Sequence, residues 1–384
     1  MQVLGSHARM CWKHKWLFLA VGLTLYITIF IMVYTLTVAS RLPPGKPLSL
    51  GTWPARPSYI PHLKNPCFFQ QKMRLVQCVP YFHVLGVDKC GTTDFHSRLT
   101  SHPDVLENNG GLGKEIYYWC WLRYGLWMMG HMLKRRFGAY LGLFTTPTKK
   151  ISDEYMWKKR QLITGDGTPM DFWDFRGWYL DPQNAGLDEP KFLTPHAMRH
   201  IYRNPKFFIL LRDPAERLYS DYMFLGYGHS PQQFARDVPR AIGMMKACLA
   251  VNSTRQCFFS DDMYHKLPMR IHISCYSVFL REWLSVFNKK HFFIIRTEDY
   301  HADVAGTLLD AYEFLGVGRP ASSTFEDVLK QGIKHETPSK KRAGKMLPET
   351  RALLDEFFAR FNIDLAQLLQ DRRFLWGTSE FSDG

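Results

Sequence analysis

One short segment of this chain combines the residue types that bind an oxyanion. An apolar run over 81–87 is followed by a set of small, hydroxyl and basic residues: Lys89, Gly91, Thr92 and Thr93. If 81–87 is a buried strand and 93–99 opens a helix, unpaired helix-start amides, two hydroxyls and an ammonium face one anion. The lysine precedes the glycine, unlike in the nucleotide-hydrolase P-loop. The segment predicts a phosphate or sulfate site, with an ordinary strand-to-helix turn as the alternative.

A second segment repeats this arrangement. Residues 206–211, KFFILL, predict another short buried strand, and Pro214 suits the first turn of a following helix. Arg212 then lies at the end of the strand, and Ser220 lies about two helical turns further on. Both side chains can meet one anion. Taken alone, the segment is equally compatible with a capped surface helix that carries ordinary salt bridges.

Together, the two segments resemble motifs of the Golgi carbohydrate sulfotransferases, which transfer a sulfuryl group from 3′-phosphoadenosine 5′-phosphosulfate (PAPS) to a sugar hydroxyl. The first loop is similar to their 5′-phosphosulfate motif, and 211–222 to their 3′-phosphate motif. The similarity continues through 292–300 and 347–362 and covers roughly residues 79–376. It implies PAPS as the cofactor, bound by Lys89, Cys90, Gly91, Thr92, Thr93, Arg212 and Ser220.

Near the carboxyl end, many heparan sulfotransferases of this family carry a Lys-Gly-Arg loop that closes over the donor. The corresponding region here, 340–345, reads KKRAGK. Its charge suits contact with the donor, and a solvated basic loop is the alternative. The donor-binding candidates in this region are Lys341, Arg342, Ala343, Gly344 and Lys345.

Sulfuryl transfer also needs a base for the attacking hydroxyl and a cation for the departing phosphate oxygen. Lys89 suits the cation role. Glu115 matches the position where related glycan sulfotransferases carry a Lys-Glu motif, so the resemblance implies that it is the base. The alternative for Glu115 is a surface carboxylate paired with Lys114 or Arg123.

Other candidates for acid–base or acceptor contacts come from two regions. The imidazoles of His83 and His96 could also act as bases. However, His83 is expected to pack in its strand and His96 to lie on a helix surface. Residues 166–169, DGTP, replace a Glu-Lys-Ser-Pro-like segment that shapes the acceptor site in the family, so they retain the acid but lose the lysine. We take Lys114 and Asp166 as the acceptor-site candidates.

Within the family, residues 78–82 and 88–95 most resemble enzymes that sulfate the 6-hydroxyl of N-acetylgalactosamine 4-sulfate. The resemblance implies chondroitin or dermatan sulfate as the acceptor. A heparan sulfate sulfotransferase is the alternative within the family, and a non-catalytic, basic glycan-binding membrane protein is the alternative of another class. A P-loop kinase is disfavoured, because no Mg²⁺-binding residues accompany a suitably placed lysine.

The charge of the chain favours an acidic partner. The formal net charge is +14 and the pI is about 9.3. A sulfated or uronate-bearing glycosaminoglycan fits this charge, whereas no nucleic acid is expected, because the sequence contains no recognisable nucleic-acid module. No cysteine or histidine cluster has metal-ligand spacing, so no metal is expected. A homodimer is left open.

Residues 16–39 form an uncharged stretch of 24 positions, long enough to cross a bilayer. More basic residues precede it than closely follow it, which favours a cytosolic amino terminus. We therefore expect a single-pass type II Golgi membrane protein with a tail (1–15), a signal anchor (16–39), a stem (40–66) and a lumenal sulfotransferase domain (67–384). A cleaved signal peptide is the alternative, although its apolar region is typically about 7 to 15 residues long.

Cysteine usage agrees with an oxidising compartment. The predicted lumenal domain contains seven cysteines, an odd number, so one thiol is expected to remain free. We expect it to be Cys90, because a disulfide inside the anion loop would restrict loop closure. The expected pairs are Cys67 with Cys78 and Cys248 with Cys257. The glycosylation sequon at Asn252 lies between the latter two cysteines and requires a surface loop.

The rest of the chain alternates between strand and helix patterns. Residues 273–287 predict a helix with an aromatic core face and with Arg281 and Glu282 turned away; 291–295 predict an inner strand, and 304–315 a helix. A helix starting at Pro348 should bury these residues before Asn362 interrupts it: Leu353, Leu354, Phe357, Phe358 and Phe361. The alternation predicts an α/β fold of the P-loop-like sulfotransferase type, with a mostly parallel sheet, flanking helices and ligands at the carboxyl ends of the strands.

Overall fold

The computed structural model describes residues 54–71, 73–127, 130–131, 133–332 and 338–377. Within them lies a five-stranded sheet of order β4-β7-β3-β8-β9. Every neighbouring pair in it is parallel. The strands of this sheet are β3 (Phe82–Gly86), β4 (Val105–Leu106), β7 (Ile163–Asp166), β8 (Lys206–Leu211) and β9 (Phe292–Arg296).

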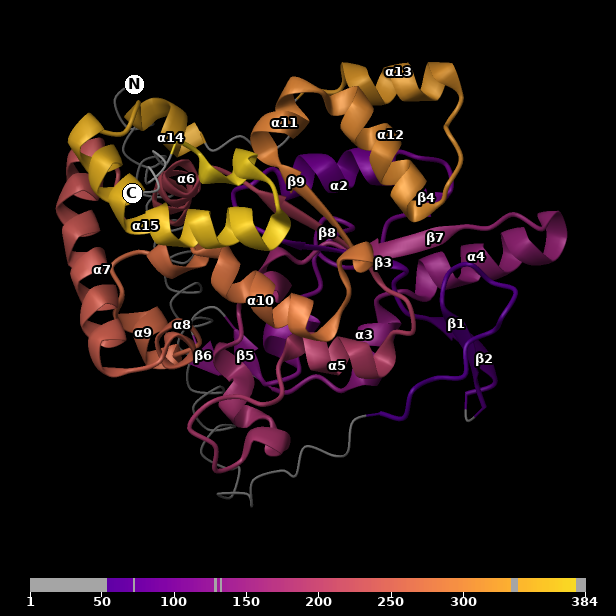
Figure 1. Cartoon of the computed structure of the whole chain (residues 1–384). Helices are drawn as coiled ribbons and strands as arrows, with labels where there is room; N and C mark the ends of the chain where they lie inside the picture. Colours follow the sequence, from indigo (N-terminus) through magenta and orange to yellow (C-terminus); the bar gives the residue numbers. More distant parts are fainter. Residues whose placement is uncertain (1–53, 72, 128–129, 132, 333–337, 378–384) are drawn as a thin grey trace, which may run out of the picture. The chain divides into compact units, whose positions relative to one another are not determined.

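Helices flank the sheet, as the sequence predicts. They are α2 (Thr92–Thr100), α3 (Phe137–Gly142), α4 (Thr145–Lys158), α5 (Thr194–Ile201), α6 (Pro214–Leu225), α7 (Pro231–Val251), α8 (Thr254–Phe258), α9 (Asp261–Lys266), α10 (Tyr276–Val286), α11 (Thr297–Ala302), α12 (Val304–Leu315), α13 (Ser322–Lys330), α14 (Pro338–Ala343) and α15 (Pro348–Leu369). Figure 1 shows α2 and α12 on one side of the sheet and α5 and α10 on the other.

The central strands explain the near-continuous apolar runs in the sequence. Strands of a parallel sheet that is covered by helices are buried on both faces and need no polar alternation. All five residues of β3 are buried. Phe208 of β8 contacts Phe82 of β3 and Phe95 of α2 edge-on, at ring-centroid distances of 5.9 and 5.2 Å. The loops that follow β3 and β8 therefore start from rigid positions in the core.

Four details of the predicted elements are wrong. The predicted inner strand is β9, which lies at the edge of the sheet and is largely half-buried. Asn362 does not interrupt α15, which continues to Leu369 with that side chain buried, and Leu353 is 43% exposed. Glu282 is not turned to solvent. It is buried beside Arg255, which donates to its carboxylate at 2.7 and 2.8 Å, because an ion pair compensates the cost of burying the charge.

Two short hairpins and two disulfides complete the fold. The hairpins join β1 (Cys67–Gln70) to β2 (Leu75–Cys78) and β5 (Leu126–Trp127) to β6 (Gly130–His131). Disulfides link Cys67 to Cys78 and Cys248 to Cys257, the pairs expected from the sequence. The expectation of a single free thiol is wrong, because three further cysteines in the described residues are buried without a disulfide: Cys90, Cys120 and Cys275.

The predicted tail and signal anchor (1–15 and 16–39) and the first part of the stem lie outside the described residues. They remain predictions. No helix in the described part of the chain combines the length and the apolar character that a membrane span requires.

Candidate active site

A cavity of about 1330 Å³ opens where β3, β8 and β9 end. This is the edge of a parallel sheet at which ligands are expected. Both predicted anion-binding segments contribute to its wall, together with residues close to the carboxyl end of the chain. The sequence-predicted site residues that line it are Lys89, Gly91, Thr92, Thr93, Glu115, Arg212, Ser220, Lys341, Gly344 and Lys345.

The loop after β3 has the backbone of an anion cradle. Lys89 and Gly91 adopt positive φ angles of 66° and 84°, and α2 begins at Thr92 directly afterwards. Only glycine adopts such an angle without strain, so Gly91 is required by the conformation. The turn exposes the first amides of α2, which have no acceptor within the helix, next to the two threonine hydroxyls.

Hydrogen bonds from neighbouring elements hold this loop. The Thr297 hydroxyl lies 2.8 Å from the carbonyl oxygen of Cys90 and 3.0 Å from that of Leu211, so it joins the ends of β3, β8 and β9. The Tyr276 hydroxyl donates to the carbonyl of Arg212 at 2.8 Å. Cys90 is fully buried, and burial raises the pKa of its thiol to about 12. Cys90 therefore supports the loop from the core and does not line the cavity.

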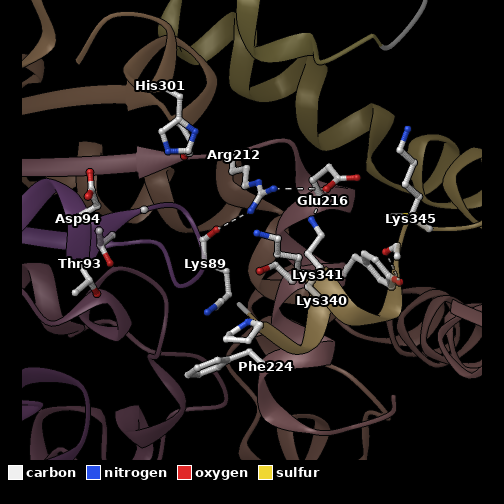
Figure 2. A pocket seen from close by; sticks show the side chains of 18 of the residues that line it. Lys89, Thr93, Asp94, Arg212, Glu216, Phe224, His301, Lys340, Lys341 and Lys345 are labelled. Carbon is white, nitrogen blue, oxygen red and sulfur yellow. Dashed lines mark hydrogen bonds and ion pairs between the residues drawn. The ribbon is translucent and has the colours of Figure 1, made fainter. Parts of the chain in front are cut away.

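The Lys89 ammonium is held beside an aromatic ring. Its Nζ lies 3.6 Å from the ring centroid of Phe224, and Figure 2 shows the side chain reaching toward that ring and away from Arg212. Burial lowers the pKa of Lys89, although the nearby Asp221 and Asp88 carboxylates oppose that shift. The cation is thus partly stripped of water, which strengthens its interaction with any anion that enters.

Lys114 connects the threonines of the loop to Glu115. Its Nζ lies 3.3 and 3.2 Å from the Thr92 and Thr93 hydroxyl oxygens and 2.7 Å from a Glu115 carboxylate oxygen. The Tyr117 hydroxyl donates to the other carboxylate oxygen. Glu115 therefore does form an ion pair with Lys114, yet its side chain remains 17% exposed and lines the cavity. A carboxylate in this position can accept a proton from a hydroxyl bound beside the loop.

The second segment places Arg212 and Ser220 on the other side of the cradle. Asp213 caps α6 by accepting from the Glu216 amide at 2.9 Å, and Pro214 occupies the first turn as predicted. Arg212 follows β8 directly and donates to the Lys89 carbonyl at 3.4 Å, while Glu216 lies 3.5 Å from its guanidinium. Ser220 is almost fully buried but still reaches the cavity.

The carboxyl-terminal basic segment forms a more exposed wall. Lys340 lies 2.5 Å from Glu216, whose pKa is lowered by this hydrogen bond although burial opposes the shift. The Tyr219 hydroxyl donates to the Gly344 carbonyl at 3.1 Å. Two of the predicted donor contacts in the segment, Arg342 and Ala343, do not line the cavity. Their prediction followed the register of a family motif, whereas the short helix α14 turns these two side chains out of the wall.

Several other predicted residues also lie elsewhere. Lys114 reaches the loop but is 1% exposed and lies behind the cavity wall, and Asp166 is equally buried at the end of β7. Asp166 accepts from Thr168 and Tyr140, so it is not available to an acceptor as predicted. His83 packs in its strand as expected. His96 is buried and not on the surface, because it faces the core behind the loop.

Sequence reasoning missed cavity residues on α6 and α11. Phe224 and Glu216 lie on α6, and Thr297 and His301 lie on α11 after β9 (Figure 2). Burial and then the Arg212 guanidinium lower the pKa of His301. The sequence did contain a signal for the residues on α11, because this helix directly follows a predicted strand. Residues in that position reach the same edge of the sheet as the two anion-binding segments.

The comparisons with known proteins agree with this geometry. A model described as a sulfotransferase domain matches residues 81–353. Carbohydrate sulfotransferase 15 of Mus musculus is 33% identical over 322 residues, which cover 81% of this chain and 57% of that protein. The Homo sapiens protein of the same name is 32% identical over 316 residues, covering 79% and 56%. The chain spans about half the length of these curated relatives.

A third relative and a solved structure are more distant. The bifunctional heparan sulfate N-deacetylase/N-sulfotransferase 4 of Mus musculus is 21% identical over 306 residues, covering 76% of this chain and 30% of that protein. A sulfotransferase structure from Alicyclobacillus acidocaldarius, 18% identical, covers 76% of this chain and 96% of its own with a TM-score of 0.48. On the match over residues 81–353, this chain belongs to the sulfotransferase family, whose donor is PAPS.

Proposed function

We propose that this chain transfers a sulfuryl group from PAPS to the 6-hydroxyl of N-acetylgalactosamine 4-sulfate in chondroitin or dermatan sulfate. The observation that carries the proposal is one cavity in which two anion-binding segments, far apart in the sequence, meet beside a carboxylate: Lys89 to Thr93, Arg212 with Ser220, and Glu115. Binding an acidic polysaccharide alone would not require two separate anion sites around a deep cavity.

The donor has two charged ends, and the cavity offers a site for each. The start of α2 supplies amides and hydroxyls for the 5′-phosphosulfate. Arg212 and Ser220 lie on the adjacent strand end and helix, where they can bind the 3′-phosphate through a charge-assisted hydrogen bond and a neutral one. Lys341 and Lys345 also line the cavity and bring further positive charge to it.

The chemistry follows from the residues between the two donor sites. In the proposed step, the Glu115 carboxylate removes the proton of the sugar hydroxyl as its oxygen forms a bond to sulfur. The bond from sulfur to the phosphate oxygen breaks, and the departing nucleotide carries the negative charge. Lys89 lines the cavity and can stabilise that charge. No metal ion has a role in these steps.

The acceptor assignment is supported by two observations. The relatives that match most of this chain are named carbohydrate sulfotransferase 15, and the resemblance of residues 78–82 and 88–95 is to enzymes that act on N-acetylgalactosamine 4-sulfate. The formal charge of +14 suits a polyanionic acceptor. We further propose that residues 16–39 anchor the chain in the Golgi membrane with the cavity on the lumenal side.

A heparan sulfate sulfotransferase is the second candidate. It is favoured by the similarity to the heparan sulfate N-deacetylase/N-sulfotransferase 4, which is weaker and covers a smaller share of the relative. The two candidates share the donor site and differ only in the acceptor. An acceptor panel therefore separates them.

The test is incubation of the purified chain with radiolabelled PAPS and separate chondroitin, dermatan and heparan sulfate acceptors, followed by disaccharide analysis. We expect label in galactosamine disaccharides that carry both the 4- and the 6-sulfate, and none with a Glu115→Gln preparation made in parallel. Label confined to heparan sulfate would overturn the acceptor assignment. Measurable PAPS binding without transfer to any of the acceptors would favour a non-catalytic glycan-binding protein.

A further inference from the structure

Three buried side chains that can bind a metal ion converge away from the cavity. His83 lies in β3, Asp166 ends β7, and Asp171 lies in the short 3₁₀ helix η2 (Pro169–Phe172). Each offers a ligand atom, and these atoms all lie within 4.8 Å of one another. Each residue is only 1% exposed. The cluster is therefore a buried site in the core and not a surface group of acids.

The backbone brings these residues together in two ways. His83 and Asp166 are register partners in adjacent parallel strands, so their side chains leave the same face of the sheet. Gly86 then allows η2 to pack onto β3, because a Cβ at that position would lie 2.8 Å from the Cβ of Phe172 and 3.0 Å from the Pro169 carbonyl oxygen. This close approach carries Asp171 to the His83 ring.

The His83 imidazole lacks the partner that a buried histidine requires. Neither ring nitrogen has a hydrogen-bond partner among the described residues, and the ring is surrounded by Tyr202 and Phe207 at centroid distances of 4.9 and 5.8 Å. In contrast, the buried His291 bonds the Pro205 carbonyl oxygen through Nδ1 at 2.8 Å. Because an unpaired buried polar group is costly, His83 points to a ligand directed at its ring nitrogens.

The two carboxylates lack an ion-pair partner. Within the described ranges, no ion pair joins a basic side chain to Asp166 or Asp171, whereas the equally buried Asp221 is paired with Arg217 and Arg270. Their hydrogen bonds come from neutral groups: Asp166 accepts from the Thr168 and Tyr140 hydroxyls, and Asp171 accepts from a backbone amide at 3.0 Å. Two buried carboxylates without an ion-pair partner carry a desolvation cost that coordination to a divalent ion would offset.

We propose that His83, Asp166 and Asp171 bind a divalent transition-metal ion, for which Zn²⁺ is the best match. One imidazole nitrogen and two carboxylate oxygens form a ligand set typical of zinc, and the two carboxylates neutralise the ion. Ligands at about 2.0 to 2.2 Å from zinc lie roughly 3.3 to 3.6 Å apart in a tetrahedral site, so binding contracts the cluster slightly. The ligands are separated by up to 88 positions in the sequence, which explains why their spacing gave no signal.

The proposed site has a structural role, which follows from the hydrogen bonds that connect Asp166 to the segment after Glu115. The Thr168 hydroxyl donates to Asp166 at 2.7 Å and accepts from the amides of Ile116 and Tyr117 at 2.9 and 3.1 Å. These two residues directly follow Glu115. A metal ion on Asp166 would therefore fix the segment that carries the carboxylate of the cavity, without itself contacting a substrate. The proposal does not depend on the proposed function.

The test measures metal in the full chain, produced with Zn²⁺ in the medium and purified without chelators. We expect about one equivalent of zinc by mass spectrometry of the metal content. His83→Gln and Asp171→Asn should each lower the bound zinc by at least about tenfold, since each removes a ligand from a three-residue site. His272→Gln is the matched control, because His272 is equally buried with an unpaired Nδ1 but faces arginines, and it should keep the zinc.

A folded wild-type protein with less than about a tenth of an equivalent of any divalent transition metal would overturn the proposal, as would ligand variants that keep the full amount. If the ligand variants do not fold, zinc X-ray absorption of the wild-type protein decides. A first shell of nitrogen and oxygen at about 2.0 to 2.1 Å, with imidazole scattering, supports the site. A shell dominated by sulfur would place the metal on cysteines and exclude this cluster.

Discussion

Two walls of the cavity are built in opposite ways. The first, here called the locked wall, consists of residues 89–93 with Glu115, and Lys114 supports it from behind. It follows a fully buried strand and is fixed by the hydroxyl of Thr297 at the Cys90 carbonyl. The second, here called the open wall, is the basic segment 340–345, most of which is exposed.

The difference indicates that the two walls contribute differently to binding and to turnover. A group whose position is set by the core before the ligand arrives incurs little ordering cost on binding, and it keeps its geometry during the reaction. Long exposed side chains must be ordered on binding, but they attract an anion from a distance. We therefore expect the locked wall to control turnover and the open wall to contribute modestly to donor affinity.

Lys89→Ala should give the largest combined loss, because it lowers both turnover and donor affinity. It removes a partly desolvated cation from the locked wall, so we expect kcat to fall by about 10² to 10³ and donor affinity by roughly tenfold. Calorimetry with PAPS and single-turnover transfer measure the two effects separately. Phe224→Leu is the control, because it removes the ring beside the ammonium but keeps the charge. Equal losses in both variants would show that the ring contact, not the cation, is what the locked wall provides.

Glu115→Gln should lower turnover alone. The amide keeps the size and the hydrogen-bonding capacity of the side chain but cannot take the hydroxyl proton, so kcat should fall by about 10² to 10⁴ while PAPS affinity and thermal unfolding stay almost unchanged. Tyr117→Phe removes a hydrogen bond to the same carboxylate and serves as a control with a smaller expected effect. Turnover of the Gln variant within about threefold of the parent would exclude Glu115 as the essential base.

Arg212→Ala tests the junction between the walls. The Arg212 guanidinium contacts the Lys89 carbonyl of the locked wall and lies beside Glu216, which binds Lys340 of the open wall. We expect a loss of donor affinity of roughly 2 to 4 kcal/mol, against about 1 kcal/mol for Ser220→Ala.

The control for Arg212 is a donor analogue without the 3′-phosphate. Its affinity should be nearly the same for the parent and for Arg212→Ala, because the group that Arg212 is proposed to bind is absent. An equal loss for both donors would mean that Arg212 acts by holding the loop, and the placement of the 3′-phosphate would be wrong.

The same contrast explains how much of the site could be predicted. The locked wall and the residues after β8 have local signals, because each is a buried strand followed by a helix start, marked by Gly91 in the first case and by Pro214 in the second. The open wall was predicted from its charge and from its resemblance to a family loop. Arg342 and Ala343 were included but do not line the cavity, since the facing of a short exposed helix depends on contacts with α6.

The remaining errors arise from tertiary neighbours. Asp166 was predicted to meet the acceptor, but the turn after β7 folds inward onto β3, and no local pattern distinguishes that turn from one that opens to the cavity. His301 was missed because its position at the cavity depends on β9 lying next to β8, and the sequence shows that a strand precedes it but not which strand is its neighbour. Site residues that directly follow a strand could therefore be predicted from the sequence. The order of the strands in the sheet could not.

The smallest expected effect is on the open wall. Lys341→Ala removes one exposed positive charge at the cavity, and screened surface interactions of this kind are worth about 0.2 to 1 kcal/mol, so donor affinity should fall by less than about fivefold. The loss should disappear near 0.5 M salt, since charges there are screened over a few ångströms. Turnover at saturating donor should not change, because the Lys341 charge does not contact the reacting atoms.

The matched control is Lys158→Ala, at an exposed lysine of α4 that does not line the cavity. It should change neither donor affinity nor turnover. A Lys341→Ala variant that loses tenfold or more in kcat would show that this segment closes on the transition state, and the division between the two walls would then be wrong.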